Sequence, residues 1–443
     1  MRPFTLLVFA AAALTAEPLT LRQALRTALE KHPGLAAANA DVDAAGSRVA
    51  QARSALLPRA SYTESVQRSN NPVFAFSSLL SQRRFTAANF AIDRLNNPDF
   101  VNNFQSRVGV EQTVWDAGRT RNATELARLG VDAAKHQRDG ERLQIAGKAA
   151  QAWLGVQLAT EAAAAADAAV ASAEADLVLA RNKRDAGLST DVDVLAIEVH
   201  LAEARAAQVR WREQSKLAAF LLNEAIGVPL DTPVEVPFPG SSPGSFAVSP
   251  LSSQVADFAA RPEISQAKTS LLTAEARVRS RTFAFWPQLI ALGSFEANRG
   301  RPFSQGAGMW FAGATLRWDF FNGFRDQHAL AEEKLNRLAS ASRLEATTRA
   351  VALDATRSHI EYTSAAGRLQ AVGGAVAMAE EVVRIARNRF SAGLATAADL
   401  LRHETALTNA KLAQHQAVHD VRLAAIAMEL ASGRLNPDSE VYQ

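Results

Sequence analysis

The chain contains one short stretch twice, as RNKRDAGLSTDVDVL at residues 181–195 and as RNRFSAGLATAADLL at residues 387–401. Eight of the fifteen residues are identical. In each copy a glycine, Gly187 or Gly393, ends a long proline-free helical pattern, and a threonine precedes the next one. Glycine reaches a left-handed conformation without steric cost, and threonine caps the start of a helix. Each stretch is therefore predicted to be the tip of a helical hairpin.

The rest of the chain repeats around these tips, so the sequence divides into two halves of one design. Each half is predicted to contain short helices, a β-hairpin and a long helical hairpin. The ranges are 17–228 with a β-hairpin at 58–115 and a helical hairpin at 119–227, then 251–433 with a β-hairpin at 287–320 and a helical hairpin at 325–432. A proline-rich linker at 229–250 joins the halves, and 434–443 form a tail.

Prolines end the short helices that precede each β-hairpin, because the residue before proline is biased out of the helical region. The expected helices are Leu19–Lys31, about 34–57, 251–260 and 262–285. The long helices are expected at 119–186, 191–226, 325–392 and 397–432. Their abundant alanine favours close packing of helices over a thick core.

Alternating residues predict four strands of about ten residues, each with one apolar and one polar face. The apolar face is clearest in the last strand, at Trp310, Ala312, Ala314, Leu316, Trp318 and Phe320. A membrane barrel and a half-buried soluble hairpin both fit this pattern. Four strands cannot close a barrel, since about eight are needed. They either pack on another element or are pooled between several chains. The loops between them are expected at 68–104 and 299–308.

The first residues predict export. Residues 1–16, MRPFTLLVFAAAALTA, have an early arginine, an apolar run and small residues at the end, as in a secretory signal peptide cut after Ala16 or Ala13. No later stretch approaches the ~20 apolar residues of a membrane-spanning helix. The chain has no cysteine and a formal net charge of only +3, which is no footprint for nucleic acid. We therefore expect a protein of the periplasm or outer membrane of a Gram-negative-type cell.

The ordered, duplicated pattern resembles the outer membrane efflux protein family, the TolC-like channel-tunnels. The resemblance covers nearly the whole mature chain. Besides the tips, it is carried by VWDAGR at 114–119, FFNGFR at 320–325, LPRASY at 57–62 and WPQLIAL at 286–292. It implies a mainly α fold with a membrane β-barrel, in which long antiparallel coiled-coil hairpins and four strands per chain form, as a homotrimer, a helical tunnel and a 12-stranded barrel.

The resemblance also implies a function without chemistry or cofactors: a passive outer membrane duct of a tripartite efflux system. Its implied partners are a periplasmic adaptor protein, an inner-membrane transporter and outer membrane lipid. A duct of a type I protein secretion system and a periplasmic coiled-coil scaffold remain as alternatives. An enzyme is disfavoured because no residues converge on a catalytic site. His415 and His419 lie one helical turn apart, but without a third ligand a zinc site is disfavoured.

Matched to the family, Asp399 falls at an acidic ring that constricts the pore, and Asp193 is its counterpart in the first repeat. Arg402 replaces a second acid of the ring, Ala395 replaces a locking arginine, and Phe390 replaces a locking tyrosine. Two alternatives follow: Phe390 closes the pore by packing, or Arg402 pairs with Asp399. A carboxylate that only stabilises the first turn of its helix is the other interpretation of both aspartates.

The tips themselves are expected to meet the adaptor. The resemblance implies this contact for Arg181, Asn182, Gly187, Leu188, Arg387, Asn388, Gly393 and Leu394. The alternative is that these residues only build stable turns. Two exposed leucines at turns favour a partner, because large apolar side chains at exposed tips are removed from water by a contact.

Overall fold

The structure of this protein is a computed structural model, and it describes residues 18–237 and 261–438. The predicted signal peptide and the helix expected at 251–260 lie outside the described residues, as does most of the linker. The chain forms two units. The first comprises Met1–Ala40, Lys135–Gln266 and Glu345–Gln443, and the second comprises Asp41–Ala134 and Ala267–Leu344.

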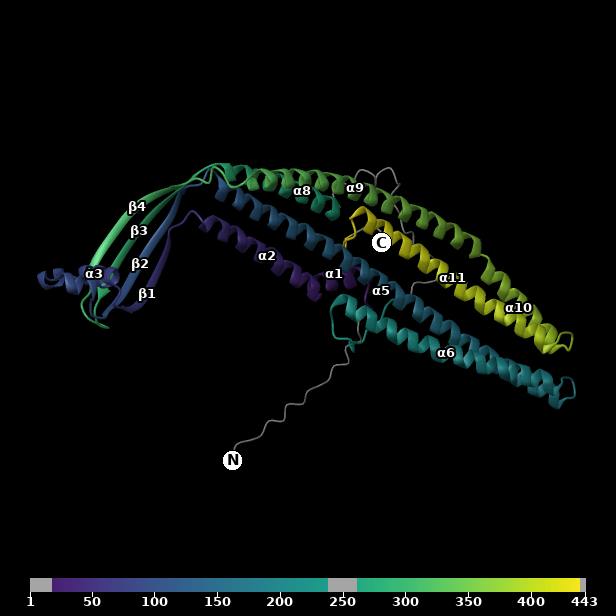
Figure 1. Cartoon of the computed structure of the whole chain (residues 1–443). Coiled ribbons are helices and arrows are strands. Elements are labelled where there is room, and N and C mark those ends of the chain that lie inside the picture. Colours follow the sequence, from purple (N-terminus) through teal and green to yellow (C-terminus); the bar gives the residue numbers. More distant parts are fainter. Residues whose placement is uncertain (1–17, 238–260, 439–443) are drawn as a thin grey trace, which may run out of the picture. The chain divides into compact units, whose positions relative to one another are not determined.

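The first unit is helical. It contains α1 (Leu21–Lys31), α6 (Asp191–Ile226), α10 (Ala375–Ser391) and α11 (Ala397–Ser432). Four further helices have residues in both units: α2 (Pro33–Ser54), α5 (Arg119–Asp185), α8 (Pro262–Thr282) and α9 (Arg325–Val372). In Figure 1, α5 with α6 and α10 with α11 form two hairpins. Among the helices of the described residues, none combines the length and apolar character needed to cross a membrane.

Small side chains fill the interior of the first unit, as the alanine content predicted. One buried cluster joins α1, α5, α6 and α11 around Leu25, Leu154 and Leu222. A second cluster joins the two hairpins near their tips, around Ile197 and Leu400. Alanine is the commonest residue of both clusters, which lets the helices approach closely, and larger aliphatic side chains supply most of the buried area.

The helix expected at 325–392 is wrong in one respect, because the structure divides it. The first part, α9, ends at Val372, and α10 begins at Ala375, with Gly373 and Gly374 between them. Glycine is about 1 kcal/mol less favourable than alanine inside a helix, so two in succession make the weakest point of the pattern. The absence of proline had concealed this break.

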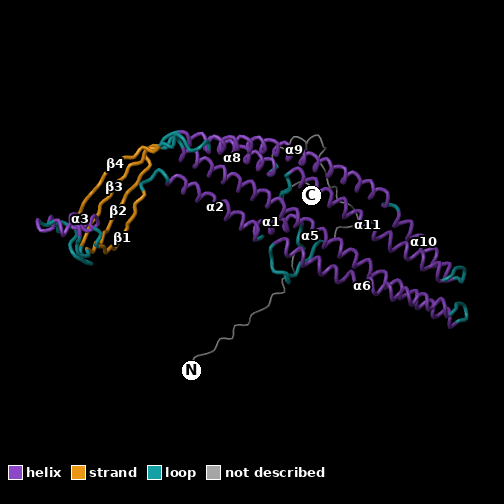
Figure 2. The backbone as a smooth tube through the Cα atoms, in the orientation of Figure 1, coloured by secondary structure: helices purple, strands orange, loops and turns teal. Residues whose placement is uncertain are grey.

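The second unit contains a four-stranded antiparallel sheet in the order β1-β2-β3-β4. The strands are β1 (Arg59–Ser69), β2 (Val101–Trp115), β3 (Gln288–Arg299) and β4 (Ala307–Arg317), and they lie side by side in Figure 2. The register places Tyr62, Val108, Phe295 and Trp310 in one row. The neighbouring row on the opposite face contains Thr63, Arg107 and Glu296. The sheet therefore has the apolar and polar faces that the alternation predicted.

The expected ends of the strands need correction. β4 ends at Arg317, so Trp318 and Phe320 lie beyond it. β2 begins at Val101, inside the loop expected at 68–104. The remainder of that loop is folded into α3 (Pro72–Ser81), the short 3-10 helix η1 (Ala87–Phe90) and α4 (Ile92–Asn96), which were not expected. A second 3-10 helix, η3 (Phe283–Phe285), precedes β3.

A polar turn converts β2 into α5. Ala117 and Gly118 both have positive φ, at 57° and 97°. The buried Asp116 carboxylate accepts hydrogen bonds from the Gly118 N–H at 3.0 Å and the Thr120 N–H at 2.7 Å. Arg119 donates to the carbonyl oxygens of Phe283 and Trp286, at 2.9 and 2.7 Å. These bonds fix the direction in which the chain leaves the sheet.

Gly227, which ends α6, provides a test of how closely this helix end packs against the backbone at His32. Its φ is +74°, and a Cβ there would lie 2.7 Å from His32 Cα, so backbone would have to move. We expect Gly227→Ala to lower the free energy of unfolding by more than the ~1–2 kcal/mol of left-handed strain alone. The measurement is thermal unfolding followed by circular dichroism in detergent.

Two glycines serve as matched controls. Gly187 has φ +70° but nothing within 4 Å of its Cβ position, so alanine there should cause only the left-handed strain. Gly155 lies inside α5 with equally free space, and alanine should stabilise it by about 0.5–1 kcal/mol. Equal losses at Gly227 and Gly187 would contradict the close approach to His32.

Candidate functional site at the tips of the helical hairpins

Both tips have the same backbone. Gly187 and Gly393 have φ values of 70° and 77°. The next N–H closes the turn, from Leu188 to the Lys183 carbonyl and from Leu394 to the Arg389 carbonyl, each at 2.8 Å. This pattern satisfies carbonyls at a helix end that would otherwise lack partners. It leaves Leu188 71% and Leu394 69% exposed.

The two aspartates expected at the constriction both cap the returning helix. The Thr190 N–H and hydroxyl donate to the Asp193 carboxylate at 3.1 and 2.8 Å, and the Asp193 N–H donates back to the hydroxyl. Thr396 and Asp399 repeat this arrangement. These hydrogen bonds, led by the one from the Thr396 hydroxyl, hold the pKa of Asp399 below its usual value.

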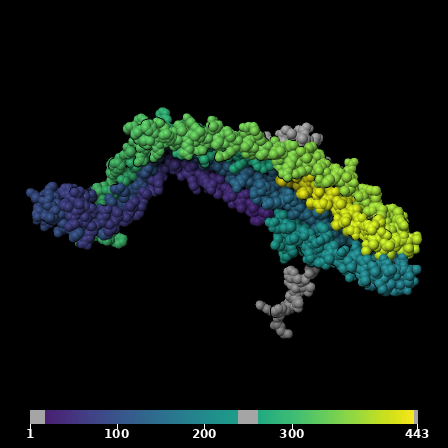
Figure 3. Space-filling model, turned by 45° about the vertical axis from the view of Figure 1, so that its right-hand side comes forward, coloured from purple at the N-terminus to yellow at the C-terminus, as the bar shows by residue number. Residues whose placement is uncertain are grey.

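Asp193 makes two contacts that Asp399 does not repeat. Its carboxylate accepts a hydrogen bond from the Ser189 hydroxyl at 3.1 Å. Its carboxylate also accepts a hydrogen bond from the backbone N–H of Ala397, the first residue of α11. Burial alone would raise the pKa of Asp193, but this bond and those from Thr190 and Ser189 hold it below its usual value. The carboxylate therefore ties the first hairpin tip to the second, and Figure 3 shows the teal and yellow tips next to each other.

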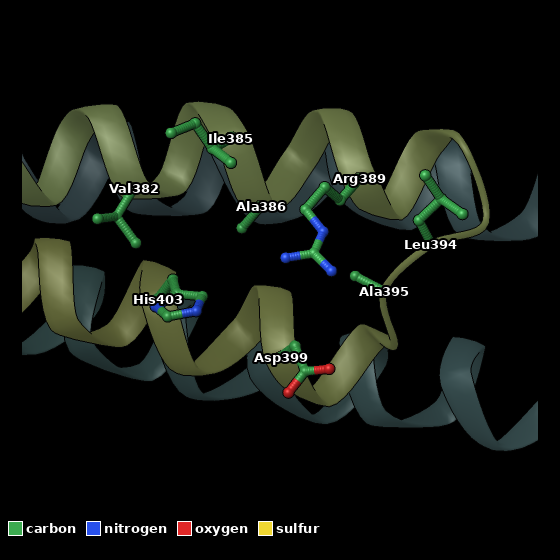
Figure 4. A pocket seen from close by; sticks show the side chains of 8 residues that line it. All are labelled: Val382, Ile385, Ala386, Arg389, Leu394, Ala395, Asp399 and His403. Atoms are coloured by element: carbon green, nitrogen blue, oxygen red, sulfur yellow. The ribbon is translucent and has the colours of Figure 1, made fainter.

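Asp399 forms an ion pair with Arg402 within the chain. Arg402 Nη1 lies 3.4 Å from Asp399 Oδ1, and the arginine side chain is 72% exposed. A groove of about 420 Å³ lies beside Asp399, between α10 and α11. In Figure 4, Arg389 extends from α10 into this groove, toward Ala395 and Asp399. Sequence reasoning had not assigned Arg389 to the site.

Phe390, expected to close the pore by packing, packs inside the chain. Its ring is 2% exposed and belongs to the cluster between the hairpins. The Lys183 ammonium lies 4.5 Å from the ring centroid and also donates to the Phe390 carbonyl. A cation over an aromatic face is attracted by the ring quadrupole. Phe390 and Lys183 thus fasten the tips together from within.

The remaining tip residues lie in two environments. Arg181 is ion-paired with Glu198 at 2.6 Å, while Asn182 and Asn388 are exposed. Arg387 is bound instead to a buried cluster. Its guanidinium contacts Asp176 at 3.1 and 3.2 Å, Ser172 at 2.6 Å, and Glu404.

This cluster joins all four tip helices. Asp176 comes from α5, Arg387 from α10 and Glu404 from α11, and His200 of α6 lies 4.0 Å from Glu404. Asp176 and Glu404 are 2% and 7% exposed, so two buried carboxylates share the guanidinium of Arg387, whose side chain is 41% exposed. Burial, and then the neighbouring Asp176, raise the pKa of Glu404 to about 7. The charge of this cluster therefore changes near neutral pH.

Part of this cluster has a sequence signal. Arg387 precedes Gly393 by six residues and Glu404 follows it by eleven, so an antiparallel hairpin places both on facing helices near the tip. No such signal exists for Asp176, because it reaches the cluster from the other half of the chain. The two histidines set aside as a zinc pair contact different carboxylates: His415 lies 2.8 Å from Glu161, and His419 lies 3.6 Å from Asp420.

The family model described as "Outer membrane efflux protein" matches residues 24–228 and 258–434. No curated protein sequence matches the chain.

Several solved structures share the fold. The Campylobacter jejuni CmeC outer membrane channel has a TM-score of 0.79 and 16% identity, covering 98% of this chain and 92% of its own. The Vibrio cholerae outer membrane protein VceC has 0.75 and 20%, covering 93% and 96%. The Neisseria gonorrhoeae MtrE outer membrane channel, in its open state, has 0.74 and 19%, covering 95% and 91%.

The pKa of Glu404 predicts a pH dependence. A carboxyl group with a raised pKa binds its proton more tightly in the folded state. Its stabilising contribution is present below the usual pKa of 4.5 and is lost as the pH rises toward about 7. A tenfold difference in proton affinity between the folded and unfolded states is worth about 1.4 kcal/mol of stability. We expect Glu404→Gln, which stays neutral, to lose less thermal stability than the wild type between pH 5 and pH 8.

The readout is the difference between variants, because carboxylates with lowered pKa, such as Asp399, act in the opposite direction. Glu213→Gln is the matched control, since Glu213 forms an exposed pair with Lys216. It should keep the wild-type pH profile. An unchanged profile in Glu404→Gln would show that the cluster holds no proton at neutral pH.

Proposed function

We propose a function for this chain from the fact that it belongs to the outer membrane efflux protein family. It is therefore an outer membrane protein whose helical part lies in the periplasm. We infer that it assembles as a homotrimer and serves as the passive exit duct of a tripartite pump. In this assembly a periplasmic adaptor docks at the helical tips, and an inner-membrane transporter supplies the solute and the energy.

The observation that carries this proposal is the open sheet. Within the described residues β1 pairs only with β2, and β4 pairs only with β3, so each outer edge has free backbone groups. Such groups cost several kcal/mol each in hydrocarbon, which leaves closure as the solution. Four strands are too few, whereas three chains supply twelve. The apolar row with Phe295 and Trp310 then faces lipid, and the polar row faces the lumen.

The tips support the proposed gate and docking surface. Threefold symmetry would bring three Asp399 carboxylates toward one another, where like charges repel and cations are attracted. The positive charges of Arg402 and Arg389 reduce that negative field. An ion pair within one chain, Asp399 with Arg402, then stands in place of the family's polar lock. Leu188 and Leu394, both exposed, offer the adaptor apolar anchors.

The assembly is tested by native mass spectrometry of protein extracted in detergent from isolated outer membranes. We expect a mass of three mature chains. A monomer, or protein found only in the soluble periplasm, would replace the duct by the scaffold alternative. The type I secretion alternative predicts the same trimer and is separated from efflux by which adaptor and transporter co-purify.

The constriction is tested by single-channel conductance in planar bilayers, with a divalent cation added on the helical side. Arg402→Ala leaves Asp399 unpaired and should lower the cation concentration needed for block several-fold. Asp399→Asn should remove the block altogether. Arg357→Ala is the control, because Arg357 forms the same kind of exposed helical pair with Glu361 away from the tips. Identical block in all three variants would exclude a pore role for Asp399.

A further inference from the structure

The long loop between β1 and β2 is a small folded body, which we call the loop cap (residues 70–100). Asn71 caps α3, accepting hydrogen bonds from the N–H groups of Val73 and Phe74 at 3.0 and 3.2 Å. Three phenylalanines stack edge to face, with ring centroids 4.7 Å apart for Phe76–Phe85 and 5.1 Å for Phe85–Phe90. The loop cap therefore has a fixed shape.

Buried amide groups attach the loop cap to the sheet. The Gln82 side chain donates to the Asn102 carbonyl at 2.8 Å and to Asn103 Oδ1 at 3.0 Å. Asn103 in turn donates to Asn298 Oδ1 on β3 at 2.9 Å. Gln82, Asn103 and Asn298 are 7%, 8% and 2% exposed. A buried amide chain of this kind resists displacement, because breaking it leaves polar groups unpaired.

The register determines which face of the sheet carries this attachment. Gln105 pairs with Ser65 and with Asn298, and Arg107 pairs with Thr63 and Glu296. Since side chains alternate between faces, Asn103 lies on this same face, two residues from Gln105. The loop cap thus sits on the polar face, opposite the row that contains Val108 and Trp310.

Gly300 gives independent support from the neighbouring loop. It directly follows β3, which ends at Arg299. A Cβ at this position would come within 2.2 Å of Arg84 Nη1 and 3.0 Å of Gln82 Oε1. The missing side chain thus leaves room for the loop cap to lie against both hairpins of the sheet. Figure 1 shows α3 at the end of the sheet remote from the strand-to-helix turns.

We propose that the loop cap turns inward over the lumen at the outer end of the barrel and forms a second constriction, at the exit, that limits the size of the solutes released. This inference rests on the proposed function, because the polar face is the lumen face only in a closed barrel. Three copies would then project into one opening. Exposed apolar side chains of the loop cap, Val73, Leu80, Phe90 and Ile92, are available to meet those of the neighbouring copies.

The absence of cysteine in the sequence provides a direct test, because one introduced thiol is labelled without background. Thr63→Cys places it on the polar face, nearer the helical end of the sheet than Asn103. Whole cells are treated with membrane-impermeant polyethylene-glycol maleimides of increasing size. We expect Thr63→Cys to react with small reagents only.

The loop cap is then removed without changing the register. Ser69 pairs directly with Val101, so an Asn-Gly turn can replace residues 70–100. In this background the large maleimides should label Thr63→Cys several-fold faster. Gln82→Ala in the full chain, which loosens the attachment only, should give an intermediate rate and keeps the test valid if the deletion fails to fold. Equal labelling by all sizes with and without the loop cap would overturn the second constriction.

Two control positions distinguish an error in the proposed second constriction from an error in the proposed duct function. Val73 lies on the loop cap and is 78% exposed. The thiol of Val73→Cys should therefore react with small reagents in the full chain. Ala312→Cys lies on the apolar face and should stay unlabelled in lipid. Labelling of Ala312→Cys in place of Thr63→Cys would mean that the polar face is not the lumen, which overturns the proposed function together with this inference.

Discussion

The hydrogen-bonding demand of the two sheet edges is the constraint on which the structure depends. In water, the free N–H and C=O groups of β1 and β4 would bind solvent, but in hydrocarbon they have no substitute. The duplicated sequence supplies only four strands, so closure requires other copies of the chain. Under the proposed function, trimer formation is thus a condition for placing this sheet in the membrane, rather than a later association of finished subunits.

The helical tips meet a different demand, which is to hold four helices together with small side chains. Alanine packing buries little area per residue, so the tips add polar contacts inside: Arg387 with Asp176 and Glu404, and Lys183 with the Phe390 carbonyl. Buried ion pairs give little net stability, but their geometry specifies which helices meet. Because the pKa of Glu404 is raised to about 7, this arrangement is also sensitive to pH near neutrality, which suits a region proposed to open.

How much of the structure the sequence could predict depends on how far apart in the chain the interacting residues lie. Local signals located the turns at Gly187 and Gly393 and the bounds of α6 and α11, because turn glycines and capping threonines act within a few residues. The break at Gly373 was local too and was overlooked. The contact of Asp176 with Arg387 and the attachment of Gln82 to Asn103 and Asn298 were beyond reach, since each joins residues far apart in the chain that only the folded structure brings together.

The two tips show how one repeated motif acquires two roles. Lys183 and Arg389 occupy equivalent positions of the repeat, yet Lys183 is buried against Phe390 while Arg389 is exposed beside Asp399. Phe390, which aligns with Arg184, is buried in the cluster between the hairpins. Asp193 accepts a hydrogen bond from the Ala397 N–H, whereas Asp399 pairs with Arg402. The two tips thus share one backbone conformation, but one carries an internal contact and the other an exposed charged surface, an asymmetry that suits the proposed gate.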